Sequence, residues 1–176
     1  MTNRIKTWLL LFALCAYSAI CTAGPYRSGV HQWDITEGKL TLMSGVMTDN
    51  AVQTYLNYTF YLEGMRDKTL YQVPVVDSKD SSKFRLTVAE SSTGDEAIQD
   101  ATIVTKQKNT WLLIGEKNTT EDASAPAPVT VRIYKLVAGY DGDWAYSFQF
   151  AKAVHYAKAK RYTVEKALSE NASGLQ

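Results

Sequence analysis

Apolar and polar residues alternate along much of this chain with the period of two that is typical of β-strands. The clearest stretch is VQTYLNYTFYLE at 52–63. One side of this stretch is apolar and comprises Val52, Leu56, Tyr58, Phe60 and Leu62. The other side comprises Gln53, Tyr55, Asn57, Thr59, Tyr61 and Glu63. The pattern predicts a long strand with one buried face.

Shorter stretches with similar patterns predict further strands. They are 33–42 with a break at Gly38, 69–77, 84–89, 101–106, 110–116 and 129–137. Pro74 cannot donate a ladder hydrogen bond, so an edge position or a bulge is expected there. Residues 107–109 predict a short hairpin, and residues 94–100, GDEAIQD, are compatible with one helical turn. The polar segment 118–128 is predicted to be a loop.

The segment GYDGDWAYSFQF at 139–150 combines two acids with five aromatic residues. Asp141 and Asp143 are too few oxygen ligands for a calcium loop, whereas Asp141-Gly142 is a strong signal for a two-residue hairpin turn. This turn predicts pairs between residues 144 and 139, 146 and 137, 148 and 135, and 150 and 133. Trp144, Tyr146, Phe148 and Phe150 would then share one face, with Trp144 covering Gly139.

The end of the chain has the pattern of a short helix. Thr163 can cap it, Val164, Ala167 and Leu168 share a face, and Gly174 would follow its last turn. Together the elements predict an all-β, mainly antiparallel domain. We expect a sandwich or a distorted barrel, with the C-terminal helix over an open end or an edge.

The first residues have the pattern of a secretory signal peptide. Arg4 and Lys6 precede a thirteen-residue apolar run, Trp8–Ile20, which is too short for a transmembrane span of roughly 20 residues. We therefore predict a signal peptide at 1–23, one domain at 24–176, and a periplasmic location. Lipidation at Cys21 is the competing route, which the bulky Ile20 before it disfavours.

Composition narrows the classes of function. A chain that begins at Gly24 has no cysteine, 17 basic and 18 acidic residues, and a formal charge of −1. Such a chain must be stabilised by its core rather than by disulfides. Its near-neutral charge argues against nucleic-acid binding, which requires clustered Lys and Arg.

The sequence contains no motif that names a reaction. His31 and His155 are too few for a zinc site built on His and Cys, and neither a G-x-S-x-G elbow nor a Ser-x-x-Lys pair occurs. We therefore expect no enzyme activity, no cofactor and no metal. The basic run Lys158-Ala-Lys160-Arg161, with Lys152 nearby, is interpreted as a solvated face, with an anionic ligand as the alternative.

Tyrosines supply the main candidate for a binding surface. Tyr55, Asn57 and Tyr61 occupy the polar side of the predicted strand at 52–63, and tyrosine combines contact area with a hydrogen bond. This face would bind a ligand or partner, or be covered by a second sheet or subunit. An exposed strand edge and surface tyrosines are consistent with a homodimer.

Two stretches, GPYRSGVHQWDI at 24–35 and GYDGDWAYSFQFAKAVHYAKAKRYTVEKAL at 139–168, resemble the carbapenem intrinsic-resistance proteins. Members of that family are periplasmic factors that protect carbapenem-producing bacteria without hydrolysing the drug. The resemblance implies binding of the β-lactam or shielding of its cell-wall targets, and it carries over no site residues. The alternatives are a periplasmic inhibitor or immunity protein that binds a hydrolase such as a lysozyme, and an enzyme acting on envelope polymers.

Overall fold

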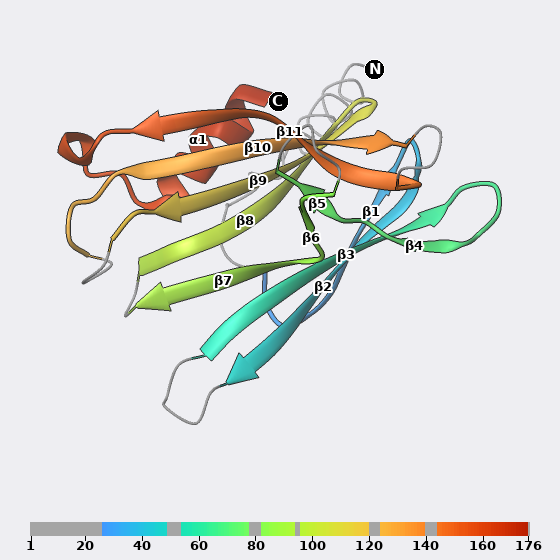
Figure 1. Cartoon of the computed structure of the whole chain (residues 1–176), viewed down its shortest axis with the longest axis horizontal. Coiled ribbons are helices and arrows are strands. Elements are labelled where there is room, and N and C mark those ends of the chain that lie inside the picture. Colours follow the sequence, from blue (N-terminus) through green and yellow to red (C-terminus); the bar gives the residue numbers. More distant parts are fainter. Residues whose placement is uncertain are drawn as a thin grey trace, which may run out of the picture.

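The computed structural model describes residues 26–48, 54–77, 82–93, 96–119, 124–139 and 144–175 (Figure 1). The predicted leader at 1–23 and the predicted turn at Asp141-Gly142, with Asp143, lie outside the described residues. The strands are β1 (Gly29–Ile35), β2 (Gly38–Thr48), β3 (Thr54–Gly64), β4 (Leu70–Gln72), β5 (Val75–Val76), β6 (Phe84–Arg85), β7 (Thr87–Thr93), β8 (Glu96–Lys106), β9 (Asn109–Lys117), β10 (Val129–Ala138) and β11 (Tyr146–Tyr156). The helices are a short 3-10 helix η1 (Lys158–Lys160) and α1 (Val164–Leu175).

Within the described part of the chain, eleven strands form one open sheet. Its order is β1-β2-β3-β7-β8-β9-β10-β11-β5-β6, with β4 paired to β3. All pairs are antiparallel except β11 with β5. The predicted all-β class and C-terminal helix are confirmed, and the architecture is a curled sheet that does not close into a complete barrel. None of the described helices is long and apolar enough to cross a membrane.

The concave side of the sheet holds the main core. This inner core joins both halves of the sheet, because the rings of Phe60 on β3 and Phe148 on β11 lie 5.3 Å apart. Its buried members are Leu40, Leu42, Tyr58, Phe60, Leu62, Val73, Val75, Val88, Ala101, Ile103, Leu112, Ile114, Tyr134, Leu136 and Phe148. The alternation predicted for β3 is confirmed, since Tyr58, Phe60 and Leu62 are fully buried.

Helix α1 covers the opposite face of β8, β9 and β10 and lies behind these strands in Figure 1. The helix-side core comprises Ala97, Val104, Leu113, Val129, Val131, Ile133, Val164, Ala167, Leu168 and Ala172. The predicted cap is present, because the Thr163 hydroxyl oxygen accepts a hydrogen bond from the Lys166 amide at 3.2 Å. Two expectations were wrong: the helix covers a face rather than an end or edge, and Gly174 lies inside it.

The register of the β10–β11 hairpin differs by one residue from the prediction. Tyr146 pairs with Ala138, Phe148 with Leu136, and Phe150 with Tyr134. The observed register places Leu136, rather than the charged Lys135, opposite the buried Phe148, so apolar side chains of both strands face the core. The Trp144 ring packs on Phe84 at 4.5 Å rather than over Gly139.

Glycine is nevertheless required at position 139 by a close approach of the two strands. A Cβ atom there would lie 1.7 Å from the Trp144 carbonyl oxygen. The Gly139 amide donates a hydrogen bond to the Ala145 carbonyl at 2.9 Å, which continues the observed register toward the turn.

Because of a β-bulge, β11 contributes side chains to both the inner core and the helix-side core. The pairing skips Ala151 between Phe150 and Lys152, so the side-chain alternation reverses there. Tyr146 and Phe148 before the bulge pack in or against the inner core. Val154 and Tyr156 after it pack against the helix-side core.

Two further expectations are corrected near β7 and β8. The segment 84–89 is divided between β6 and β7, and residues 96–100 begin the long strand β8 instead of a helical turn. Tertiary contacts hold this strand, because the Ala97 amide donates to Glu165 on α1 at 3.1 Å. The predicted hairpin between β8 and β9 is confirmed, with Lys106 paired to Asn109. Pro74 lies between β4 and β5, which agrees with the expected interruption.

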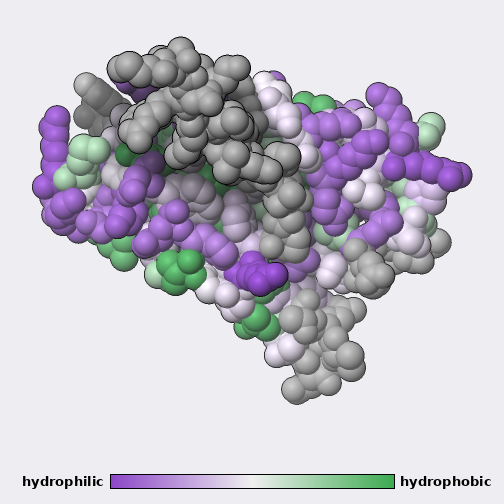
Figure 2. Space-filling view, turned by 180° about the vertical axis from the view of Figure 1, so that it is seen from behind, coloured by the Kyte–Doolittle hydropathy of each residue, from purple (hydrophilic) through white to green (hydrophobic). Residues whose placement is uncertain are grey.

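The described surface that is visible in the rear view of Figure 2 is predominantly polar, with apolar side chains in separate spots. Among the described residues, the large apolar side chains that are exposed include Val30, Met43 and Met47 on β1 and β2.

Candidate functional site

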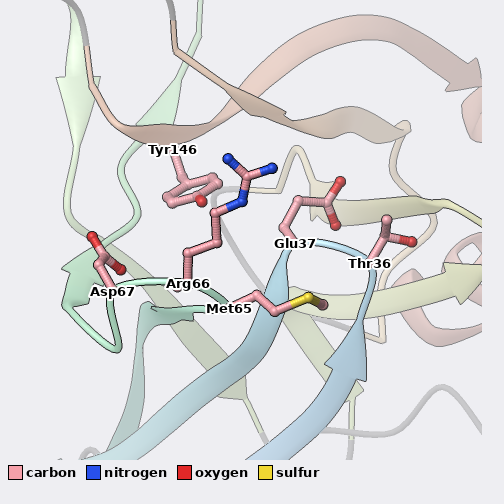
Figure 3. A pocket seen from close by; sticks show the side chains of 7 residues that line it. Thr36, Glu37, Met65, Arg66, Asp67 and Tyr146 are labelled. Carbon is pink, nitrogen blue, oxygen red and sulfur yellow. The ribbon is translucent and has the colours of Figure 1, made fainter.

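A pocket of about 580 Å³ lies where three connections of the sheet meet (Figure 3). We call it the turn pocket, and its lining residues are Thr36, Glu37, Gly64, Met65, Arg66, Asp67 and Tyr146. Thr36 and Glu37 form the β1–β2 turn, Gly64 ends β3, Met65 to Asp67 follow it, and Tyr146 begins β11. Its volume falls within the range of roughly 300–1,000 Å³ that is usual for small-molecule sites.

Backbone contacts hold the first two connections together. The Met65 amide donates a hydrogen bond to the Glu37 carbonyl at 3.3 Å. Gly38 permits this approach, because a Cβ atom at this position would lie 2.0 Å from the Glu63 carbonyl oxygen, and its φ of +148° is one that other residues rarely adopt. The predicted break at Gly38 therefore places a turn on the end of β3 and forms one wall of the turn pocket.

Asp67 is engaged by its own loop. It accepts hydrogen bonds from the Thr69 amide at 3.1 Å and from the Tyr71 hydroxyl. The Tyr71 hydroxyl, followed by the Thr69 amide, lowers the pKa of Asp67. Asp67 is thus an ionised structural carboxylate that fixes the loop carrying Arg66. The Tyr71 ring in turn contacts the Tyr146 ring at 5.5 Å in an edge-to-face arrangement.

Arg66 and Glu37 provide the unmatched polar groups of the turn pocket. Arg66 is exposed, and its side chain points toward the space between Tyr146 and Glu37 (Figure 3). No ion pair of Arg66 occurs within the part of the chain that the structure describes. The Oε2 atom of Glu37 is buried and has no hydrogen-bond partner there. The pocket can therefore offer a cation and an acceptor to a ligand.

A second polar cluster lies inside the molecule, where β7 separates from β8. Asp100 is 1% exposed, and its Oδ1 atom accepts hydrogen bonds from the Ala101 amide at 2.7 Å and the Tyr58 hydroxyl at 3.2 Å. Its Oδ2 atom is buried without a partner among the described residues. Burial raises the pKa of Asp100 to about 7, and burial also raises the pKa of Glu90 nearby. Because Tyr58 and Asp100 are both buried, we interpret this cluster as part of the core.

The predicted surface residues lie elsewhere. Tyr55, Asn57 and Tyr61 are half-buried on the face of β3 that points away from the inner core. Asn57 is flanked by Gly45 and Ala89, and Tyr61 by Thr41 and Gln72. The structure does not bring these three residues to the turn pocket, and their role in binding stays a prediction.

The histidines and the basic run lie apart from the turn pocket. His31 donates a hydrogen bond from Nε2 to the Arg27 carbonyl at 2.7 Å, and His155 Nδ1 lies 3.0 Å from the Thr130 hydroxyl. Among the described residues, no three His, Cys, Asp or Glu side chains form a group that could hold a metal ion. Lys158, Lys160 and Arg161 are exposed around η1.

Sequence reasoning missed the residues of the turn pocket. The segment EGMRDK at 63–68 contains no motif that marks Arg66 as a binding residue. Glu37 and Tyr146 are far from it in the chain, so only the folded sheet brings the three together.

Comparison with known proteins supports the fold. No protein-family model and no curated protein sequence matches this chain. A similar solved structure is the crystal structure of CarG, with a TM-score of 0.61 and 22% sequence identity over 87% of this chain and 94% of that chain. At this identity the similarity establishes a shared fold.

Proposed function

We propose that this chain is an exported protein that protects the cell from a carbapenem β-lactam without hydrolysing the drug. The observation that carries this proposal is the fold shared with CarG over nearly the whole length of both chains. A second observation is the resemblance of residues 24–35 and 139–168 to carbapenem intrinsic-resistance proteins. We take CarG to represent that family. We further propose a periplasmic location, which the signal-peptide pattern at 1–23 supports.

The chemistry of the turn pocket fits binding better than catalysis. Its side chains offer a guanidinium, a carboxylate, an aromatic ring and a thioether. Nucleophilic catalysis requires a hydroxyl or thiol activated by a neighbouring base. Within the described residues, the hydroxyls of Thr36 and Tyr146 make no hydrogen bond to such a base. Protection by stoichiometric binding of the drug, or by shielding its targets, is therefore our preferred mechanism.

The test is expression of the full chain in a carbapenem-sensitive bacterium, with drug quantified by mass spectrometry. We expect higher tolerance than with the empty vector, an unchanged amount of intact drug, and mature protein in the periplasmic fraction. A variant without residues 1–23 should give no protection, because it would not reach the compartment of the targets. Loss of drug would indicate an enzyme, and unchanged tolerance with normal periplasmic protein would refute protection.

A second candidate is a periplasmic inhibitor or immunity protein that binds a cell-wall hydrolase. The exposed apolar side chains of Val30, Met43 and Met47 favour this candidate, because they lie on the same side of the sheet as Tyr55 and Tyr61. Aromatic and methionine side chains are enriched at protein interfaces. Inhibition of a purified lysozyme by stoichiometric amounts of the protein would support this alternative.

A further inference from the structure

We propose that the turn pocket binds a small molecule that carries a carboxylate and a hydrogen-bond donor, with the carboxylate on Arg66 and the donor on Glu37. This inference rests on the proposed function only in the choice of ligand, and it names the site at which that function would bind its ligand. Arg66, Glu37 and Tyr146 are the residues that would contact the ligand.

Arg66 supplies the strongest recognition group. A guanidinium binds a carboxylate through two parallel hydrogen bonds, a geometry that lysine cannot reproduce. The loop of Arg66 is fixed on both sides, because the Gly64 amide donates to the Thr69 carbonyl at 2.9 Å and Asp67 is held by Tyr71. A fixed loop lowers the ordering cost of binding, although the exposed side chain still has to be ordered.

Glu37 supplies the complementary group. Its Oε2 atom is buried and without a hydrogen-bond partner among the described residues. A buried polar atom without a hydrogen-bond partner destabilises the folded protein, and a charged one does so more strongly. A ligand N–H, hydroxyl or ammonium placed at this oxygen would remove that destabilisation. The Oε2 atom of Glu37 therefore lacks a hydrogen bond that a ligand donor would supply.

The charges of the lining select between ligands. The carboxylate oxygens of Asp67 already accept hydrogen bonds from its own loop, so Arg66 and Glu37 are the groups left to act on a ligand. A bare anion would pair with Arg66 but be repelled by Glu37. A ligand with both a carboxylate and a donor satisfies both side chains at once, which makes it the better match.

The remaining walls suit an apolar body. Tyr146 presents a half-buried ring that Tyr71 orients edge-on, and Met65 is 59% exposed beside it. Aromatic rings contribute contact area with little loss of side-chain freedom, and methionine adapts to irregular shapes. The volume of about 580 Å³ holds a compact bicyclic molecule or a dipeptide.

Two ligands of the envelope share this chemistry. A carbapenem carries a carboxylate and a polar side chain, and the D-alanyl-D-alanine end of a cell-wall peptide carries a carboxylate next to amide N–H groups. Binding of the first would mean that the protein sequesters the drug. Binding of the second would mean that it shields the substrate end that the drug imitates.

Isothermal titration calorimetry with protein beginning at Gly24 tests this inference. The probes are imipenem, N-acetyl-D-alanyl-D-alanine and acetate. We expect one of the first two to bind and Arg66→Ala to weaken its binding at least tenfold. Arg27→Ala removes the same charge at the opposite end of β1 and should change the affinity less than twofold. Glu37→Gln should weaken the donor-bearing ligand while leaving acetate unchanged or bound more tightly.

Absence of binding by both larger probes up to millimolar concentration would overturn the assigned site. Equal affinity of folded Arg66→Ala and the original protein would do the same, with folding checked by near-UV circular dichroism. These outcomes are separate from the tolerance assay. Protection without pocket binding would leave the proposed function standing and remove the site, whereas binding without protection would keep the site and remove the function.

Discussion

At the scale of single residues, Asp100 is a buried acid whose carboxyl group has too few hydrogen-bond partners among the described residues. Burial is the main cause of its raised pKa. The negative charges of Glu90 and Glu165 raise this pKa further. Its Oδ2 atom has no partner there, so an ionised carboxylate would be costly at this position. Protonation removes most of this cost and provides a donor.

We expect Asp100→Asn to flatten the pH dependence of stability. The folded pKa of about 7 lies above the ordinary aspartate value of 3.8, so the folded state binds the proton more tightly than the unfolded state. Stability is therefore highest below pH 4, falls as pH rises from 4 to 7, and stays low above 7. The total fall from this group is at most about 4 kcal/mol. Asparagine keeps the acceptor for Ala101 and Tyr58 and needs no proton.

Urea unfolding between pH 4 and 8 measures this effect. The Asp100→Asn protein should be more stable than the original at pH 8. Asp34→Asn, which removes an exposed carboxylate on β1, should leave the slope unchanged. Identical pH profiles for Asp100→Asn and the original protein would show that Asp100 is ionised in the folded state.

The residues of the turn pocket show why sequence reasoning found a surface but not a cavity. The face of Tyr55, Asn57 and Tyr61 follows from local alternation alone, and the structure places all three on that face. The turn pocket depends on Glu37, Arg66 and Tyr146, whose proximity requires the curl of the sheet. No local pattern encodes that distance, so Arg66 is indistinguishable in the sequence from any other turn arginine.

At the scale of elements, helix α1 rests directly on β9 at Gly115. A Cβ atom there would lie 2.8 Å from Val164 Cγ1 and 3.1 Å from Leu168 Cγ. We expect Gly115→Val to push the helix away and to lower the free energy of unfolding by about 1–3 kcal/mol, the usual cost of overpacking. Gly45→Val is the matched control, because a Cβ atom on Gly45 of β2 meets nothing within 4 Å.

Urea unfolding monitored by circular dichroism at 222 nm compares the two glycine variants. Gly115→Val should unfold at lower urea and lose helical signal before the sheet unfolds, whereas Gly45→Val should stay close to the original protein. Equal midpoints for both variants would mean that α1 is not packed on Gly115 as described.

The type of most elements was predictable from the sequence, whereas the register between β10 and β11 was not. The strands at 52–63 and 110–116 follow from alternation and β-branched composition, and Thr163 correctly marks the start of α1. The register of β10 and β11 was wrong by one residue, because a turn signal fixes a loop but not the pairing of the strands beyond it. The bulge at Ala151 was also missed, since one extra residue leaves no trace in composition.

At the scale of the whole molecule, the segment from β4 to β5 connects β3 with β11, which are not neighbours in the sheet order. The Val73 amide donates to the Phe60 carbonyl on β3, and the Pro74 carbonyl accepts from the Phe148 amide on β11, both at 2.9 Å. Pro74 donates nothing itself and so fits the crossing point. The parallel pairing of β11 with β5 follows from this crossing and could not be read from local patterns. The two halves of the sheet therefore share one core.

A shared core predicts that both halves unfold in one cooperative step. Trp33 on β1 packs against the inner core and lies 5.7 Å from the Tyr26 ring, whereas Trp111 on β9 packs against the helix-side core. Each tryptophan therefore reports on a different half. Loss of the contacts between Phe60 and Phe148 would expose both halves together, so neither half should retain structure alone.

Two single-tryptophan proteins that begin at Gly24 test this cooperativity. One keeps Trp33 with Trp111→Phe and Trp144→Phe, and the other keeps Trp111 with Trp33→Phe and Trp144→Phe. Fluorescence and far-UV circular dichroism should give the same urea midpoint within each protein, because every probe follows one transition. A Trp33 signal that changes at lower urea than the circular dichroism of the same protein would divide the chain into two folding units. Agreement within both proteins would mean that a ligand bound at the turn pocket, which joins β1, β3 and β11, stabilises the whole domain rather than one half of it.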